Sequence, residues 1–185
     1  MEPLSGMHVL DLTRLLPGPY CAWFLRSWGA QTVKVEDPAV GDYLREAQPV
    51  WFAHLNAGAE SLALDLKQPA GREAFLRLAA GADVVLEGFR PGVMERLELG
   101  YDALKAVNPR LVLTSVSGYA ADSGLAQRAG HDLGYLARSG LLSLMGEIPP
   151  LQLADLSGGL MAAAATLAAV VQALRTGRGA HVETA

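Results

Sequence analysis

Two segments place a titratable side chain where a helix is predicted to begin. His131 lies in the small-residue turn 129–132 (AGHD), from which a side chain can point into a cleft. Asp155 precedes the glycine pair 158–159, at the start of a long apolar segment. Amides exposed at a helix start stabilise developing negative charge and hold a carboxylate ionised. Each residue also has a structural interpretation, because a lone histidine is more often structural and an aspartate here is a typical N-cap.

Spacing alone does not join these two residues, which lie 24 positions apart. The other histidines, His8, His54 and His181, have no acidic or histidine partner at ligand spacing, so we expect surface or packing roles for them. No glycine-rich dinucleotide motif follows the first strand, and no phosphate loop ends in Gly-Lys-Ser/Thr. The sequence shows no metal-ligand cluster either. Its chemistry would therefore not be that of a standard dinucleotide, nucleoside triphosphate or metal site.

An alternation of strand and helix patterns must position these residues. Helices are predicted at 21–28, where Pro19 suits the first turn, and at 69–81, 101–107, 132–145 and 156–176, while 37–62 has the composition of a loop. Short apolar runs predict strands at 8–12, 32–36, 83–87 and 110–116. Strand–helix–strand units favour an α/β fold with a Rossmann-like parallel sheet flanked by helices.

The turn 17–19 (PGP) lies at the carboxyl end of the first predicted strand, where α/β proteins usually bind ligands. A plain strand-to-helix turn without a ligand explains it equally well. No linker divides the chain, so we treat residues 1–185 as one domain.

Composition excludes several classes of protein. The 185 residues are 51% hydrophobic and 18% charged, which indicates an ordered globular chain. A formal net charge of −4 disfavours nucleic-acid binding. The single cysteine, Cys21, cannot form an internal disulfide, and no basic segment follows Met1, so we expect a cytoplasmic protein. The longest apolar stretch, 160–174, is too short to span a bilayer, so no membrane association is expected.

Taken together, the segments resemble the family III CoA-transferases (the CaiB/BaiF family), and within them the α-methylacyl-CoA racemases. The resemblance runs from Leu4 to about Val182. Each segment alone is weakly specific, but their order along the chain is highly specific. The matching segments are 9–13 (VLDLT) with 17–19 (PGP), 29–30 (GA) before 33–36 (VKVE), 62–67 (LALDLK), 82–92 (ADVVLEGFRPG), 107–110 (VNPR), 130–132 (GHD), and 154–155 (AD) with 158–159 (GG).

The resemblance implies roles for both candidate residues. Transferases of this family use an aspartate at the position of Asp155 to attack the acyl-CoA carbonyl and form a mixed anhydride, and they generally lack a histidine at the position of His131. Racemases resemble this sequence in having Gly-His-Asp followed by Tyr135 and by Ser139–Gly140. In that subfamily the histidine and the aspartate are the acid–base pair. The resemblance therefore implies a racemase in which His131 and Asp155 are catalytic.

Such a pair suits the reaction. Inversion of the carbon beside a thioester carbonyl removes a proton from one face and returns one to the other, and two groups near neutral pKa do this well. Histidine titrates in that range without help, whereas aspartate needs its environment to raise its pKa. The enolate oxygen needs hydrogen-bond donors, which amides beside Asp155 could supply. No metal and no covalently bound cofactor is implied; coenzyme A enters as the thioester substrate.

The resemblance also implies that CoA lies across the α/β lobe. Its basic contacts would meet phosphates. Without the resemblance, Lys67 and Arg96 would be interpreted as residues of a solvated face. The implied contact positions are Leu64, Lys67, Gly88, Phe89, Arg90 and Arg96.

Two loops depart from the family pattern. The family usually has an arginine after the glutamate of the second strand, where this chain has Asp37. A loop commonly written Asn-Arg-Gly-Lys-Arg-Ser is here 56–61 (NAGAES), with Glu60 at a usually basic position. Up to four basic side chains near CoA are missing, which predicts CoA binding weaker by about one to two orders of magnitude.

The third departure is length. Members of the family are about twice as long, and their second half carries a smaller lobe, part of the substrate pocket and a further acidic residue. The expectation is a fragment, a split-gene subunit or a shortened relative, partnered by a second copy or by a chain that supplies the other lobe. Helix 156–174 would then be covered by that partner, because it is apolar around most of its circumference.

Three functions follow in order of preference. The first is an acyl-CoA racemase or epimerase that inverts the α-carbon of a 2-methylacyl-CoA. The second is a CoA-transferase with Asp155 as nucleophile, which His131 disfavours. The third is a non-catalytic relative that binds CoA poorly or serves as a scaffold for a partner.

Overall fold

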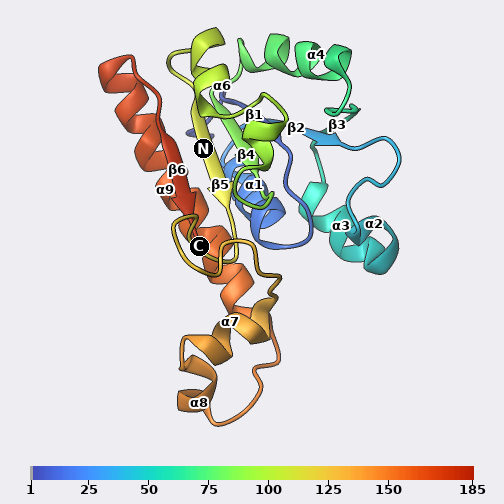
Figure 1. Ribbon diagram of the computed structural model, residues 1–185, viewed down its shortest axis with the longest axis vertical. Helices are drawn as coiled ribbons and strands as arrows, with labels where there is room; N and C mark the ends of the chain where they lie inside the picture. The colour runs from blue at the N-terminus through green and yellow to red at the C-terminus, as the bar shows by residue number, and fades with distance from the viewer. Residues whose placement is uncertain (1) are drawn as a thin grey trace.

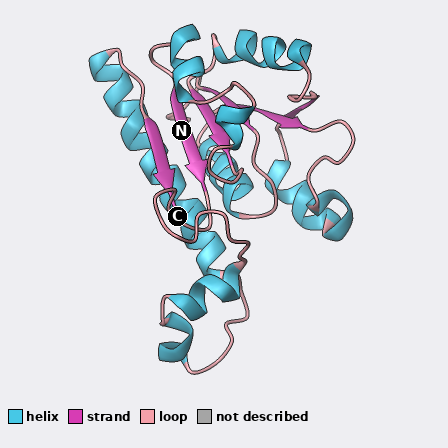
Figure 2. Ribbon diagram, viewed as in Figure 1, coloured by secondary structure: helices cyan, strands magenta, loops and turns pink. Residues whose placement is uncertain are grey.

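The computed structural model describes residues 2–185 and contains a six-stranded parallel sheet (Figure 1, Figure 2). The strand order is β3-β2-β1-β4-β5-β6, and every neighbouring pair is parallel. This order confirms the predicted Rossmann-like sheet. The strands are β1 (His8–Asp11), β2 (Gln31–Glu36), β3 (Glu60–Ala63), β4 (Val84–Glu87), β5 (Val112–Val116) and β6 (His181–Thr184).

Helices cover both faces of the sheet. On one face, α1 (Pro17–Ser27) and α9 (Leu153–Thr176) pack against apolar side chains such as Val9, Val84 and Val112. On the other face, α4 (Pro69–Ala79) and α6 (Tyr101–Val107) pack against Leu10 and its neighbours. Because β4 is buried on both faces, it is apolar at consecutive positions rather than alternating.

Two edge strands were missed by the sequence analysis. Segment 37–62 was expected to be loop, but it holds α2 (Leu44–Ala47), α3 (Pro49–Asn56) and the first three residues of β3. Strand β6 was not predicted, and neither was the short helix α5 (Val93–Arg96). The sequences of β3 (ESLA) and β6 (HVET) contain no apolar run, because edge strands expose much of their surface.

The helix predicted at 132–145 is two helices. Helix α7 (Asp132–Arg138) ends before Gly140, whose φ of 79° lies in the left-handed region, and α8 (Leu141–Met145) follows at a new angle. Both lie beyond the carboxyl edge of the sheet, at the bottom of Figure 1. The glycine therefore confines α7 to a short segment, and His131 lies at its start.

Helix α9 lies close to α1 through a face of small residues. Gly159, Ala162 and Ala163 are buried at this contact, and a Cβ on Gly159 would lie 2.5 Å from the carbonyl oxygen of Pro17. The 24-residue helix is long and apolar enough to cross a membrane by length and composition, which the shorter stretch 160–174 had not suggested. Seven of its residues are buried, among them Ala162 and Ala163 in the core, while Leu160, Met161 and Leu174 are exposed.

Candidate active site

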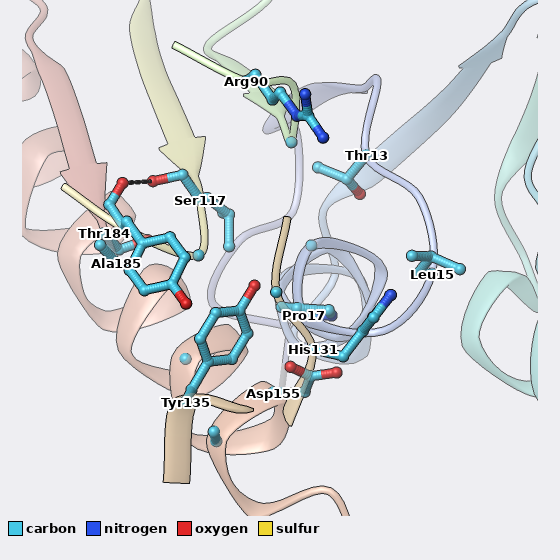
Figure 3. A pocket seen from close by; sticks show the side chains of 18 of the residues that line it. Thr13, Leu15, Pro17, Arg90, Ser117, His131, Tyr135, Asp155, Thr184 and Ala185 are labelled. Atoms are coloured by element: carbon cyan, nitrogen blue, oxygen red, sulfur yellow. Dashed lines mark hydrogen bonds between the residues drawn. The ribbon is translucent and has the colours of Figure 1, made fainter. Parts of the chain in front are cut away.

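A cavity of about 950 Å³ opens at the carboxyl edge of the sheet (Figure 3). Its walls are the loops that follow β1, β4 and β5, together with the first turns of α7 and α9. Ligands of open parallel sheets bind at this edge. The turn 17–19, singled out in the sequence, contributes Pro17 and Gly18 to the wall.

His131 and Asp155 both line this cavity, and Figure 3 shows them in the same part of it. His131 is the N-cap residue of α7 and is exposed. The structural alternative for Asp155, the N-cap of the long helix, is wrong, because α9 begins at Leu153 after Gln152. Asp155 therefore lies within the first turn, where its side chain faces the cavity instead of capping the helix.

A hydrogen bond joins the two helix starts. The buried carboxylate of Asp132 accepts the backbone N–H of Asp155 through Oδ1, at 3.0 Å. Asp132 follows His131 directly, so this bond fixes the distance between the two candidate residues along the cavity wall. Sequence reasoning did not assign a role to Asp132. The sequence did contain one signal for Asp132, an acidic residue in the first turn of a predicted helix.

The surroundings of Asp155 raise the pKa of its carboxyl from 3.8 to about 6. Burial is the largest cause, the negative charge of Asp132 adds to it, and His131 acts in the opposite direction. Burial followed by the charge of Asp155 also raises the pKa of Tyr135, which lines the same wall. Asp155 can therefore take up or release a proton near neutral pH, as an acid–base group must.

Tyr135 closes one side of the cavity by packing onto small residues. A Cβ on Gly130 would lie 2.6 Å from the Tyr135 ring, and one on Gly118 would clash with the hydroxyl. Tyr119 meets the same ring edge-on, at 5.4 Å between centroids. Glycine beside His131 is thus required by the packing of this aromatic ring.

The structure brings together three of the six positions implied for CoA. Gly88, Phe89 and Arg90 line the cavity directly after β4. Leu64, Lys67 and Arg96 do not line it. Leu64 and Lys67 follow β3, which ends at the same edge of the sheet, whereas Arg96 lies in α5. The first three positions therefore share the cavity with the candidate residues, and the other three lie outside its wall.

One departure from the family pattern acts directly on Lys67. The carboxylate of Asp37 lies 3.4 Å from Lys67 Nζ and also accepts the amide N–H of Ala39 at 2.9 Å. The hydrogen bond from Ala39 is the largest cause and lowers the pKa of Asp37; burial opposes it, and the bond from Lys67 lowers the pKa further. A phosphate would have to compete with Asp37 for this lysine.

Cys21, His54 and His181 do not line this cavity. Within residues 2–185, no three His, Cys, Asp or Glu side chains gather where they could hold a metal ion. Cys21 is buried, and burial raises the pKa of its thiol to about 12, which leaves it unreactive. His54 stacks on Trp23, and His181 stacks on Tyr101, so both have packing roles.

A sequence profile of the family described as CoA-transferase family III matches residues 4–185. Among curated proteins, the chain is 42% identical to the human α-methylacyl-CoA racemase, covering 97% of this chain and 47% of that protein. It is 38% identical to the acetyl-CoA:oxalate CoA-transferase of Acetobacter aceti, covering 98% of this chain and 50% of that protein. Relatives with both activities are thus similar to the chain.

Among solved structures, a CaiB/BaiF family protein from Brucella suis superimposes with a TM-score of 0.94 at 34% identity, covering 99% of this chain and 53% of that one. A hypothetical protein from Mycobacterium tuberculosis gives 0.93 at 37% identity, covering 100% and 54%. The chain spans about half the length of the curated relatives that it matches.

Proposed function

The chain belongs to CoA-transferase family III, and from this premise we propose that it carries the acid–base pair of an acyl-CoA racemase or epimerase. The substrate would be a 2-methylacyl-CoA, inverted at its α-carbon. One observation carries the proposal: His131 and Asp155 share a cavity in which the pKa of Asp155 is raised to about 6. Such a pKa suits a group that must both take up and release a proton near neutral pH.

The reaction would proceed in two proton transfers. One residue of the pair, as its free base, removes the α-proton and leaves an enolate of the thioester. The other, protonated, returns a proton to the opposite face, so that the carbon is inverted and the two residues have exchanged protonation states. The reverse reaction starts from the exchanged state, and each enantiomer therefore uses a different residue as base.

The enolate oxygen needs a hydrogen-bond donor on the cavity wall. The amide N–H of Asp155 already donates a hydrogen bond to Asp132, and that of Leu156 donates to the carbonyl oxygen of Gln152. Within residues 2–185 the amide of Ala154 has no acceptor, and Ala154 lines the cavity. We therefore assign the amide of Ala154, at the positive end of the α9 dipole, as the donor to this oxygen.

A CoA-transferase is the second candidate, favoured by the CoA-transferases among the relatives. In that reaction Asp155 would attack the thioester carbonyl, expel the CoA thiolate and become an aspartyl anhydride. The acceptor carboxylate would then displace the donor acid from the anhydride, and the CoA thiolate would attack the acceptor's acyl carbon, which releases the acceptor's CoA thioester and regenerates Asp155. His131 would have no part in these steps.

Incubation of a 2-methylacyl-CoA with the protein in deuterated water separates the candidates. If a second copy or a partner chain contributes to the cavity, the incubation should include it. The racemase proposal predicts deuterium at the α-carbon and no transfer of CoA to an added carboxylate. The transferase candidate predicts no α-deuteration and an anhydride on Asp155 that hydroxylamine traps. If neither α-deuteration nor the anhydride is detected, the result supports the non-catalytic alternative.

A further inference from the structure

We propose that Arg14 forms an oxyanion-binding subsite on the cavity wall. The group bound would be a phosphate of CoA or a carboxylate carried by the acyl chain. The identity of this ligand rests on the proposed function, but the oxyanion chemistry of the subsite does not. Arg14 lies in the loop that follows β1, and it is not among the residues implied for CoA or for catalysis.

Two aromatic rings hold the guanidinium of Arg14 at the cavity. Its carbon Cζ lies 5.6 Å from the ring centroid of Tyr43 and 5.8 Å from that of Phe89. Nη1 also donates to the Tyr43 hydroxyl, at 3.4 Å. All three residues line the cavity, and they come from three different loops. A guanidinium held on aromatic faces keeps its charge and its edge donors for a planar anion.

The charge balance of the cavity favours an anion. Arg14, Arg90 and Arg128 line it, and Asp155 is the single acidic side chain in its wall. Within residues 2–185, none of these three arginines forms an ion pair. Arg14 is the half-buried member, whereas Arg90 and Arg128 are exposed. A partly desolvated cation without a counter-charge binds an oxyanion more strongly than an exposed one does.

A buried ion cluster fixes the backbone on both sides of Arg14. Lys34 Nζ donates to the carbonyl of Thr13 at 2.8 Å and lies 3.2 Å from Asp42 Oδ2 and 3.5 Å from Asp11 Oδ2. Asp11 accepts the amide of Thr13 at 2.8 Å. The side chains of Lys34, Asp11 and Asp42 are at most 2% exposed. The cluster therefore holds the residue before Arg14 from within the core.

The residue after Arg14 is held by the same cluster. Leu15 has a φ of 64°, a left-handed conformation that residues with a side chain rarely adopt, and its amide donates to Asp42 Oδ1 at 3.1 Å. That oxygen also accepts the amide of Leu44 at 3.0 Å, so it fixes the backbone beside Tyr43 as well. Arg14 and its aromatic partner are thus positioned before any ligand arrives, which favours tight binding.

Titration calorimetry on the full chain tests the subsite with four probes: CoA, pantetheine, propionyl-CoA and succinyl-CoA. The variant Arg14→Met keeps the aliphatic stem and removes the charge. Arg77→Met is the matched control, because Arg77 pairs with Glu73 on the exposed surface of α4. Circular dichroism should confirm that both variants fold, and Arg14→Gln, which also removes the charge, replaces Arg14→Met if the latter does not.

We expect Arg14→Met to lose affinity by about 10- to 100-fold, as for loss of a charge-assisted hydrogen bond. Loss for CoA but not for pantetheine identifies a phosphate, and loss for succinyl-CoA but not for propionyl-CoA identifies an acyl carboxylate. Equal binding of all four probes by Arg14→Met and the unsubstituted chain would overturn the proposal.

A second readout does not depend on CoA recognition. The Nε–Hε resonance of Arg14, assigned with the Arg14→Lys variant, should shift when inorganic pyrophosphate or succinate is added at millimolar concentration. If the unsubstituted chain binds no thioester but this resonance shifts, the subsite stands and the proposed function fails. If the resonance does not respond to either anion, the subsite is refuted whatever the thioesters do.

Discussion

At the scale of single residues, the environment of Asp155 sets the pKa of its carboxyl. Burial and the charge of Asp132 raise its pKa to about 6. We predict that Asp132→Asn lowers the pKa of Asp155 but leaves it above 3.8, because burial, the larger cause, remains. Carbon-detected NMR of the Asp155 carboxyl measures this directly, with exposed Asp122→Asn as control. An unchanged pKa in Asp132→Asn would contradict the account.

The same shift predicts a pH-dependent stability effect. Asp155 has its ordinary pKa near 3.8 when unfolded and about 6 when folded, so the folded chain holds the proton more strongly. Stability therefore falls as pH rises from 3.8 to 6, and the penalty is complete above 6. Asp155→Asn should be more stable by about 1 kcal/mol at about pH 8, after allowance for solvent screening. The gain should vanish below about pH 4.

Chemical denaturation at several pH values measures this difference. Exposed Asp122→Asn again serves as the control, since it should change stability little at any pH. A variant Asp155→Asn that is less stable than the unsubstituted chain at about pH 8 would show that the carboxylate is held by favourable contacts instead.

Asp37 should weaken CoA binding by engaging Lys67. We predict dissociation constants for CoA thioesters of about 0.1–1 mM, and a several-fold gain in affinity for Asp37→Ser, which can still accept the amide of Ala39. Calorimetry with CoA measures both values. Micromolar binding by the unsubstituted chain would mean that other basic residues replace the contacts missing from loop 56–61.

Candidate residues could be found from the sequence, but their proximity could not. A histidine in a small-residue turn and an aspartate before two glycines are local patterns, and the resemblance gave both a role. What joins them is the bond from Asp155 to Asp132 across 23 positions, a tertiary contact without local signal. Arg14 and its buried support were missed for the same reason, because Lys34 in a strand looks like an exposed residue.

At the scale of elements, the contact between α1 and α9 positions Asp155. Gly159 lies one turn after Asp155, where a Cβ would meet the carbonyl of Pro17. We predict that Gly159→Ala destabilises the chain by about 1–3 kcal/mol through overpacking. Gly158→Ala is the matched control, because a Cβ there meets nothing within 4 Å. Urea denaturation of both variants should separate them, and equal stabilities would contradict this packing.

Buried elements were predicted better than edge elements. Strands β1, β4 and β5 are rich in apolar residues because the sheet is covered on both faces, and β2 carries alternating valines, so the sequence pattern revealed all four within one or two residues. Strands β3 and β6 lie at the edges and are held by backbone pairing to β2 and β5, which leaves little trace in residue type. The prediction of one continuous helix over 132–145 was wrong, because Gly140 separates two shorter helices.

At the scale of the whole molecule, exposed apolar side chains on α9 and α8 predict association. Leu174 is 66% exposed, Met161 62% and Leu144 85%. We expect the 185-residue chain to self-associate, or to bind a dye for apolar surfaces, unless a partner covers this surface. Sedimentation velocity and dye fluorescence test this, with Leu144→Glu and Met161→Glu expected to reduce both signals. A monomer that binds no dye would contradict it.

The central claim is that His131 and Asp155 act on opposite faces of the α-carbon. The most direct measurement is α-deuterium incorporation into each enantiomer of a 2-methylacyl-CoA, with any chain that completes the cavity present. His131→Ala should slow exchange from one enantiomer by about 10²- to 10⁴-fold, and Asp155→Asn should slow exchange from the other. Equal slowing of both enantiomers by each variant, or exchange unaffected by His131→Ala, would contradict the account.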